Sequence, residues 1–127
     1  MKRIILGLSV LLMLVQNGFA LNDSKAAKIK YIRNQVSLCN KEIQNIKYAD
    51  VNICIKAKKL MLNNGGILVF TKQDIASINQ FIGVIYHITL HDKIKAYKYY
   101  MISAQQGCIE AQDNLDIMCR KSPWACQ

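Results

Sequence analysis

The stretch that decides the fold runs from Ile82 to Cys119 and contains the segments Lys95-Ala96-Tyr97-Lys98-Tyr99-Tyr100, Ala104-Gln105-Gln106-Gly107 and Ala111-Gln112-Asp113-Asn114-Leu115. Small and aromatic residues recur in it at helical spacing, and Gly107 interrupts the pattern once. Two short antiparallel helices joined by a tight turn produce such a pattern. We therefore predict a helical hairpin that turns at Gly107.

The order of these residues resembles the Sel-one-like repeat, a short relative of the tetratricopeptide repeat. The matching positions are Ala96, Tyr99, Tyr100, Ala104, Gly107, Ala111, Gln112, Asn114 and Leu115. Asp116 stands where the family usually has Gly, and Cys119 stands where an aromatic residue is usual. The resemblance covers about a third of the chain and implies a helical-repeat scaffold rather than a particular reaction.

A regular apolar stripe upstream predicts a first helix that begins near Lys25. Its members recur at steps of three and four residues and are Ile29, Ile32, Val36, Cys39, Ile43 and Ile46. Asp50 then stands where it can cap a second helix over about 51–62, and two Asn and two Gly at 63–66 end that helix. These two helices should form an antiparallel hairpin.

Further along the chain, a short extended segment is predicted at 67–70, followed by three more helices. Thr71 and Asp74 form a capping box that opens the first of them. The three helices are predicted over about 71–90, 93–106 and 109–120. The sequence therefore predicts an all-α fold of about five antiparallel helices, in a helical-repeat-like array stapled by disulfides.

Residues 1–20 have the composition of a secretory signal peptide. Two basic residues at 2–3 precede an apolar run over 4–15, and small residues follow up to a cleavage site after Ala20. The run is too short for a stable membrane span. We expect a cleaved protein without a transmembrane anchor, periplasmic or secreted, with a single helical domain over 21–127.

The chain carries 17 Lys and Arg residues against 8 Asp and Glu, which gives a formal net charge of +9. Such an excess indicates an acidic partner, whether protein, anionic lipid or cell-wall polymer. A solvated lysine-rich face explains the same composition equally well. Because the sequence shows neither an Arg-rich cluster nor an interleaved aromatic platform, nucleic-acid binding is disfavoured.

Five cysteines in a small exported chain indicate a disulfide framework. Cys39 and Cys54 lie almost equidistant from the turn of the first hairpin at 46–47, so they should face each other. We predict a Cys39–Cys54 bridge that ties the first two helices together.

The pairing of the last three cysteines is less constrained. Cys108 and Cys119 lie on one predicted helix about 16 Å apart, which is too far for a disulfide. Cys126 can reach either of them, and the short loop with a turn at Pro123 favours Cys119–Cys126. Cys108 is then free, or it bridges two copies of the protein in a homodimer.

No group of residues in the sequence indicates a reaction. His87 and His91 are one helical turn apart, but no third metal ligand stands at a recognised spacing. A thiol nucleophile at Cys108 would need a nearby His and an orienting group. We predict no catalytic residue, no metal site and no cofactor.

The expected function is therefore a non-catalytic protein–protein interaction. The resemblance implies an exported adaptor or inhibitor, because some bacterial immunity proteins that neutralise toxin enzymes are Sel-one-like repeat proteins. In that case the lysine-rich face of this protein would bind an acidic cleft of the toxin. The alternatives are a secreted adaptor or virulence-associated factor that binds a host protein or an anionic surface, and, less favoured, a small thiol or metal hydrolase. The candidate interface residues are Lys56, Lys58, Lys59, Tyr97, Tyr100 and Cys108.

Overall fold

The computed structural model describes residues 24–64 and 70–127, and in these ranges it is helical apart from short turns and contains no strand. The predicted signal peptide at 1–20 lies outside the described residues, as does most of the predicted extended segment at 67–70. No helix among the described residues has the length and apolar character needed to cross a membrane.

The chain divides into two units, with the boundary between Tyr31 and Ile32. The described residues of the first unit are helical. The second unit, residues 32–127, holds both disulfides and almost all of the buried side chains of the described chain. The described ranges contain five α-helices, which confirms the predicted all-α fold.

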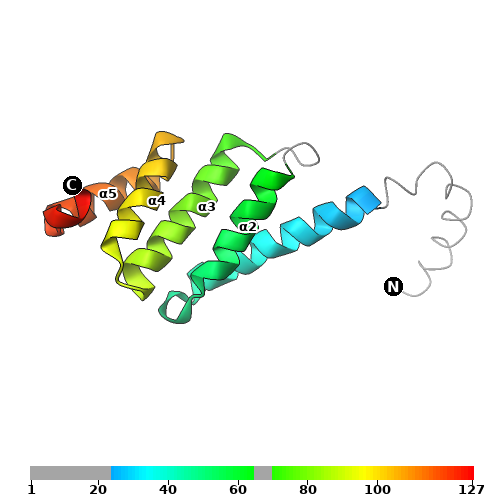
Figure 1. The fold of residues 1–127 in the computed structure, drawn as a ribbon, viewed down its shortest axis with the longest axis horizontal. Coiled ribbons are helices and arrows are strands. Elements are labelled where there is room, and N and C mark those ends of the chain that lie inside the picture. The colour runs from blue at the N-terminus through cyan, green and yellow to red at the C-terminus, as the bar shows by residue number, and fades with distance from the viewer. Residues whose placement is uncertain (1–23, 65–69) are drawn as a thin grey trace, which may run out of the picture. The chain divides into compact units, whose positions relative to one another are not determined.

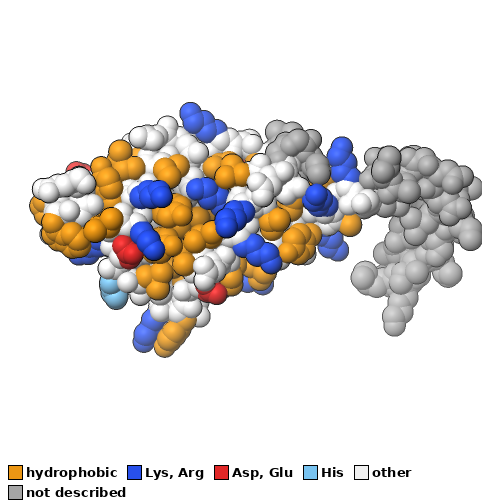
Figure 2. Space-filling model, in the orientation of Figure 1, with side chains coloured by type: hydrophobic (Ala, Val, Ile, Leu, Met, Phe, Trp, Pro, Cys, Tyr) orange, Lys and Arg blue, Asp and Glu red, His pale blue; other side chains and the backbone are white. Residues whose placement is uncertain are grey.

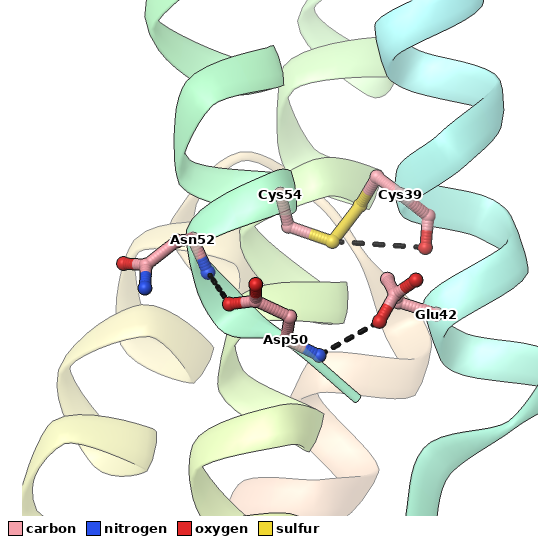
Figure 3. Close-up of a disulfide and its surroundings, with 5 residues drawn as sticks. All are labelled: Cys39, Glu42, Asp50, Asn52 and Cys54. Carbon is pink, nitrogen blue, oxygen red and sulfur yellow. Dashed lines mark hydrogen bonds between the residues drawn. A yellow bond between two sulfur atoms is a disulfide. The ribbon is translucent and has the colours of Figure 1, made fainter. Parts of the chain in front are cut away.

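The N-terminal helix runs over 24–44, so the unit boundary falls within it. The first hairpin of the second unit consists of the part of this helix from residue 32 on and helix α2, Val51–Asn63. Cys39 and Cys54 face each other across it, with 4.7 Å between their Cα atoms, and form the predicted disulfide (Figure 3). The Glu42 carboxylate accepts a hydrogen bond from the Asp50 backbone N–H at 2.7 Å. Asp50 in turn caps α2 by accepting from the N–H of Asn52 at 3.0 Å. The turn is therefore held by a covalent bond and by two carboxylate hydrogen bonds.

Helix α3, Lys72–Val84, begins with the predicted capping box. The Thr71 hydroxyl accepts from the Asp74 N–H at 3.1 Å, and the Asp74 carboxylate accepts from the Thr71 N–H at 2.8 Å. Both bonds satisfy backbone donors that the first helical turn leaves without a carbonyl partner. Thr71 and Asp74, which are three residues apart, are therefore sufficient to fix where α3 begins.

The end of this helix differs from a regular α-helix, because residues Ile85–Thr89 form the π-helix η2. The N–H of Leu90 donates to the carbonyl of Ile85, five residues back, at 3.0 Å. The hydroxyl of Thr89 donates to the carbonyl of Ile46 in the turn of the first hairpin. The sequence predicted a regular helix to about residue 90. The structure has a wider π-helical turn instead, and there the Thr89 hydroxyl can donate to the Ile46 carbonyl.

Two further helices complete the second unit. Helix α4, Lys93–Gln105, and helix α5, Ile109–Lys121, meet at Gly107, whose φ of 97° is the left-handed conformation that favours glycine. The short 3₁₀ helix η3, Pro123–Cys126, follows. The predicted Cys119–Cys126 disulfide ties η3 to α5, with Cα atoms 5.7 Å apart. Figure 1 shows α2, α3, α4 and α5 packed side by side in chain order.

Tyr100 lies at the centre of the contact between α3 and α4. Its side chain is 1% exposed, which corrects the sequence-based expectation that it marks an interface. The ring lies directly against Gly83 of α3: a Cβ atom on Gly83 would lie 2.6 Å from Cδ1 of Tyr100. Ala96 and Met118 are buried in the same cluster. Because Gly83 has no side chain, it leaves the space that the buried ring of Tyr100 occupies.

Candidate functional site

Two stacked tyrosine side chains with a lysine at each end form a row across the helical array. Tyr86 of η2 and Tyr99 of α4 stack with their ring centroids 5.6 Å apart and their planes 20° from parallel. The ammonium of Lys58 from α2 lies over the Tyr99 ring, 5.1 Å from its centroid. The ammonium of Lys95 lies 5.4 Å from the centroid of the Tyr86 ring. We call these four residues the tyrosine–lysine strip.

The position of each helix brings these residues together from distant parts of the sequence. Helix α3 packs between α2 and α4, so Lys58 reaches across it to Tyr99. The π-helix places Tyr86 beside Tyr99, and α4 supplies Lys95 one helical turn before Tyr99. In Figure 2, lysine and arginine side chains lie over the apolar surface of α2, α3 and α4 on the face shown.

One positive charge of the strip, that of Lys58, is partly removed from water, whereas Lys95 is exposed. Partial burial lowers the pKa of the Lys58 ammonium, and the neighbouring charge of Lys98 lowers it further. Partial burial raises the pKa of the Tyr99 hydroxyl, so it stays neutral and its ring keeps the electron-rich face that attracts a cation. In the described part of the chain, no carboxylate lies within ion-pairing distance of Lys58, Lys95 or Lys98.

The interface residues expected from the sequence do not form one surface. Lys58 belongs to the strip, whereas Lys56 and Lys59 are exposed and lie three residues apart on another face of α2. Tyr97 lines a separate groove with Met101 and the Cys119–Cys126 disulfide. The sequence already places lysines and tyrosines close together over 95–100, and the fold adds Lys58 and Tyr86 from other elements.

Cys108 is the free cysteine, as predicted, and it is half-buried before the first residue of α5. Its thiol donates a hydrogen bond to the Glu110 carboxylate at 3.3 Å. The backbone N–H of Glu110 and this thiol lower the pKa of the exposed Glu110 carboxyl. The bridge between two copies through Cys108 stays a prediction.

The imidazole of His87, which also belongs to the π-helix, has its Nδ1 3.2 Å from the Tyr100 hydroxyl. Partial burial lowers the pKa of His87, and the positive charges of Lys93, His91 and Lys121 lower it further. Burial raises the pKa of the Tyr100 hydroxyl, which therefore stays protonated. His87 and Cys108 are thus bonded to other partners rather than to each other.

Stability should fall as the pH drops through the titration range of His87. The unfolded chain takes up a proton near pH 6.5, the ordinary value for histidine, whereas the folded chain resists protonation until a lower pH. The contribution is fully present above pH 6.5 and is lost as the pH falls to the lowered folded pKa. Urea unfolding between pH 7.5 and 5 measures this slope.

The matched variants for that measurement are His87→Gln and His91→Asn. The first should flatten the slope between pH 7 and 5, because it removes the group with the shifted pKa. The second should preserve most of it, since asparagine tolerates the positive φ of 54° at this position. An unchanged slope in His87→Gln would contradict this assignment.

Neither a metal-binding cluster among the described residues nor a known relative points to a chemistry for this chain. No group of three or more His, Cys, Asp or Glu side chains within residues 24–64 and 70–127 is arranged to hold a metal ion. The matching positions of the Sel-one-like resemblance lie on α4, on α5 and at Gly107 between them, but no similarity to that family is found. No protein-family model, curated protein or solved structure matches this chain.

Proposed function

We propose that this protein is a non-catalytic binding module that attaches to an acidic surface of a partner protein through the tyrosine–lysine strip. The observation that carries the proposal is the placement of Lys58 and Lys95 over stacked tyrosine rings with no carboxylate partner in the described chain. A surface lysine usually extends into water, and partial dehydration without a counter-charge is unfavourable. A carboxylate from a partner would offset that cost.

The composition of the strip suits a protein interface. Tyrosine contributes a large contact area with little loss of side-chain freedom, and aromatic residues dominate the binding energy of many interfaces. The lysines add electrostatic steering toward an acidic patch. Both kinds of residue are held in place by contacts within the free protein, so binding does not have to order them.

The same geometry favours an acidic protein over a nucleic acid. Single-stranded nucleic acids bind by stacking their bases on free aromatic faces. Here Tyr86 and Tyr99 stack on each other, and an ammonium lies over each ring. The rings therefore present edges and positive charge rather than an open stacking platform.

Two features support an exported inhibitor as the biological form of this module. The composition of residues 1–20 is that of a secretory signal peptide. The two disulfides belong to proteins of oxidising compartments. An immunity protein that covers the acidic cleft of a toxin enzyme would use such a module, and suppression of a lytic activity is its expected effect.

The test is affinity capture on the immobilised protein, without reductant, from envelope and secreted fractions. A single stoichiometric partner should be retained, and the double charge reversal Lys58→Glu with Lys95→Glu should weaken its binding about 100-fold, since like charges then oppose the acidic surface. The matched control is the double reversal Lys41→Glu with Lys72→Glu, which changes the net charge equally at exposed lysines outside the strip. Biolayer interferometry at two salt concentrations measures both variants.

A second pair of variants tests the aromatic part of the strip. Tyr99→Ala should weaken binding about 30-fold, as expected for an interface hot spot, whereas Tyr97→Ala should have little effect because Tyr97 lines another groove. Equal losses in the two charge-reversal proteins would show non-specific attraction only. Preferential retention of anionic vesicles or single-stranded nucleic acid would overturn the protein-partner assignment.

A further inference from the structure

A small pocket lies where the end of α3, η2, α4 and α5 meet. Its volume is about 350 Å³, at the lower end of the range of about 300–1,000 Å³ in which small-molecule sites fall. One wall is apolar and consists of Val84, Ile88, Ile117 and Met118. Ile88 and Ile117 are 49% and 44% exposed, so their apolar surface is open to solvent and available to a ligand.

The pocket is also lined by cationic residues. Lys93 and Lys121 line the pocket, and no acidic side chain is among the described residues that line it. The ammonium of Lys93 is held in place, because it donates a hydrogen bond to the hydroxyl of the buried Ser122 at 2.8 Å. That bond uses one of the three donors of the ammonium and leaves two for a ligand.

His87 adds a directed donor to the pocket. The buried Tyr100 hydroxyl has no partner other than His87 among the described residues, so both groups are satisfied when the hydroxyl donates to Nδ1. The neutral imidazole then carries its proton on Nε2. His87, Lys93 and Lys121 thus supply hydrogen-bond donors to a pocket without a negative charge.

We propose that this pocket binds a small organic carboxylate with a compact apolar body. The carboxylate accepts hydrogen bonds from Lys93, Lys121 and the imidazole, and the apolar body covers Ile88, Ile117 and Met118. Inorganic phosphate would satisfy the cations but leave the apolar wall uncovered. The π-helix provides a local reason for the site, because such turns are frequent where a helix is shaped for function.

The experiment is an NMR titration of the folded protein with phenylacetate, which has both required parts. We expect chemical-shift changes confined to the residues that line the pocket, and an upward shift of the His87 pKa in the complex. The direction follows because a bound anion stabilises the imidazolium, which partial burial and then the charges of Lys93, His91 and Lys121 disfavour in the free protein. Acetate lacks the apolar body and phenethylamine lacks the negative charge, so both should bind at least about tenfold more weakly.

The matched variants are Lys121→Gln and Lys72→Gln, which remove the same charge from exposed lysines inside and outside the pocket. Lys121→Gln should weaken phenylacetate binding about fivefold, and Lys72→Gln should leave it unchanged. Equal effects of the two variants, equal binding of phenethylamine, or an unchanged His87 pKa would overturn the proposal.

This site is independent of the tyrosine–lysine strip. Both sites use the π-helix, which supplies Tyr86 to the strip and His87 to the pocket. Lys58 and Lys95, however, do not line the pocket, so the Lys58→Glu, Lys95→Glu protein should bind phenylacetate like the unchanged protein. Loss of phenylacetate binding in that variant would contradict the separation of the two sites.

Discussion

Replacing Cys39 and Cys54 together with alanine should lower the free energy of unfolding by about 3 kcal/mol. The bridge joins residues 15 apart in sequence and closes the first helical hairpin, so its loss releases conformational freedom chiefly in the unfolded chain. A domain of this size is stable by roughly 5–15 kcal/mol, so the change is a large share of the total. Urea unfolding without reductant measures it.

The control for this experiment is Cys108→Ala. It removes a half-buried thiol that closes no loop, and it should change the free energy of unfolding by less than about 1 kcal/mol. The hairpin retains its carboxylate hydrogen bonds at Asp50 in both proteins. If the double alanine variant unfolded at the same urea concentration as Cys108→Ala, the bridge would not contribute to stability.

Replacing Gly83 with alanine should destabilise the fold by about 1–2 kcal/mol, although alanine favours helices. Helix propensity alone would stabilise the protein by about 1 kcal/mol. The added Cβ, however, would lie 2.6 Å from the ring of Tyr100, which is almost fully buried, so the ring or the helix would have to shift. Overpacking of this kind costs about 1–3 kcal/mol, and it should exceed the gain in propensity.

The sign of this effect should reverse when the ring is absent. In a Tyr100→Ala background the same Gly83→Ala substitution should stabilise by up to about 1 kcal/mol, because only the propensity term remains. A double-mutant cycle by urea unfolding measures both values. The same sign in both backgrounds would show that the contact between residue 83 and the tyrosine ring does not control packing here.

Local sequence signals were sufficient for the helices and for both disulfides. The starts of α2 and α3 follow from Asp50 and Thr71, whose side chains satisfy nearby backbone groups in the structure. The Cys39–Cys54 pairing follows from symmetry about a hairpin turn, which needs only helix geometry. These features depend on residues close in sequence or related by a simple turn.

The candidate sites depend on contacts that sequence spacing does not reveal. Tyr99 and Tyr100 are adjacent on one helix, and the sequence analysis placed Tyr100 at an interface, whereas it is buried. The reason is Gly83 on another helix, where the missing side chain admits the ring of Tyr100. In the strip, Lys58 of α2 contacts Tyr99 of α4 across α3. No local sequence pattern predicts a contact between residues so far apart in the chain.

The π-helix was missed for a related reason. Steps of three and four residues continue through Ile85 to Thr89, so the pattern is that of a regular helix. The wider turn is accompanied by a hydrogen bond from Thr89 to Ile46, in a different hairpin. A hydroxyl at an apolar position of the stripe was the signal that something other than core packing occurs there.

The order of the cysteines has a consequence for how the protein is made. Each disulfide joins neighbours in the cysteine order, and Cys108 lies between the two pairs. A chain that emerges with its amino terminus first exposes Cys39 and Cys54 before any other thiol. At that moment the native pairing has no competitor within the same molecule, so the first hairpin can be locked while the remaining helices are still being synthesised.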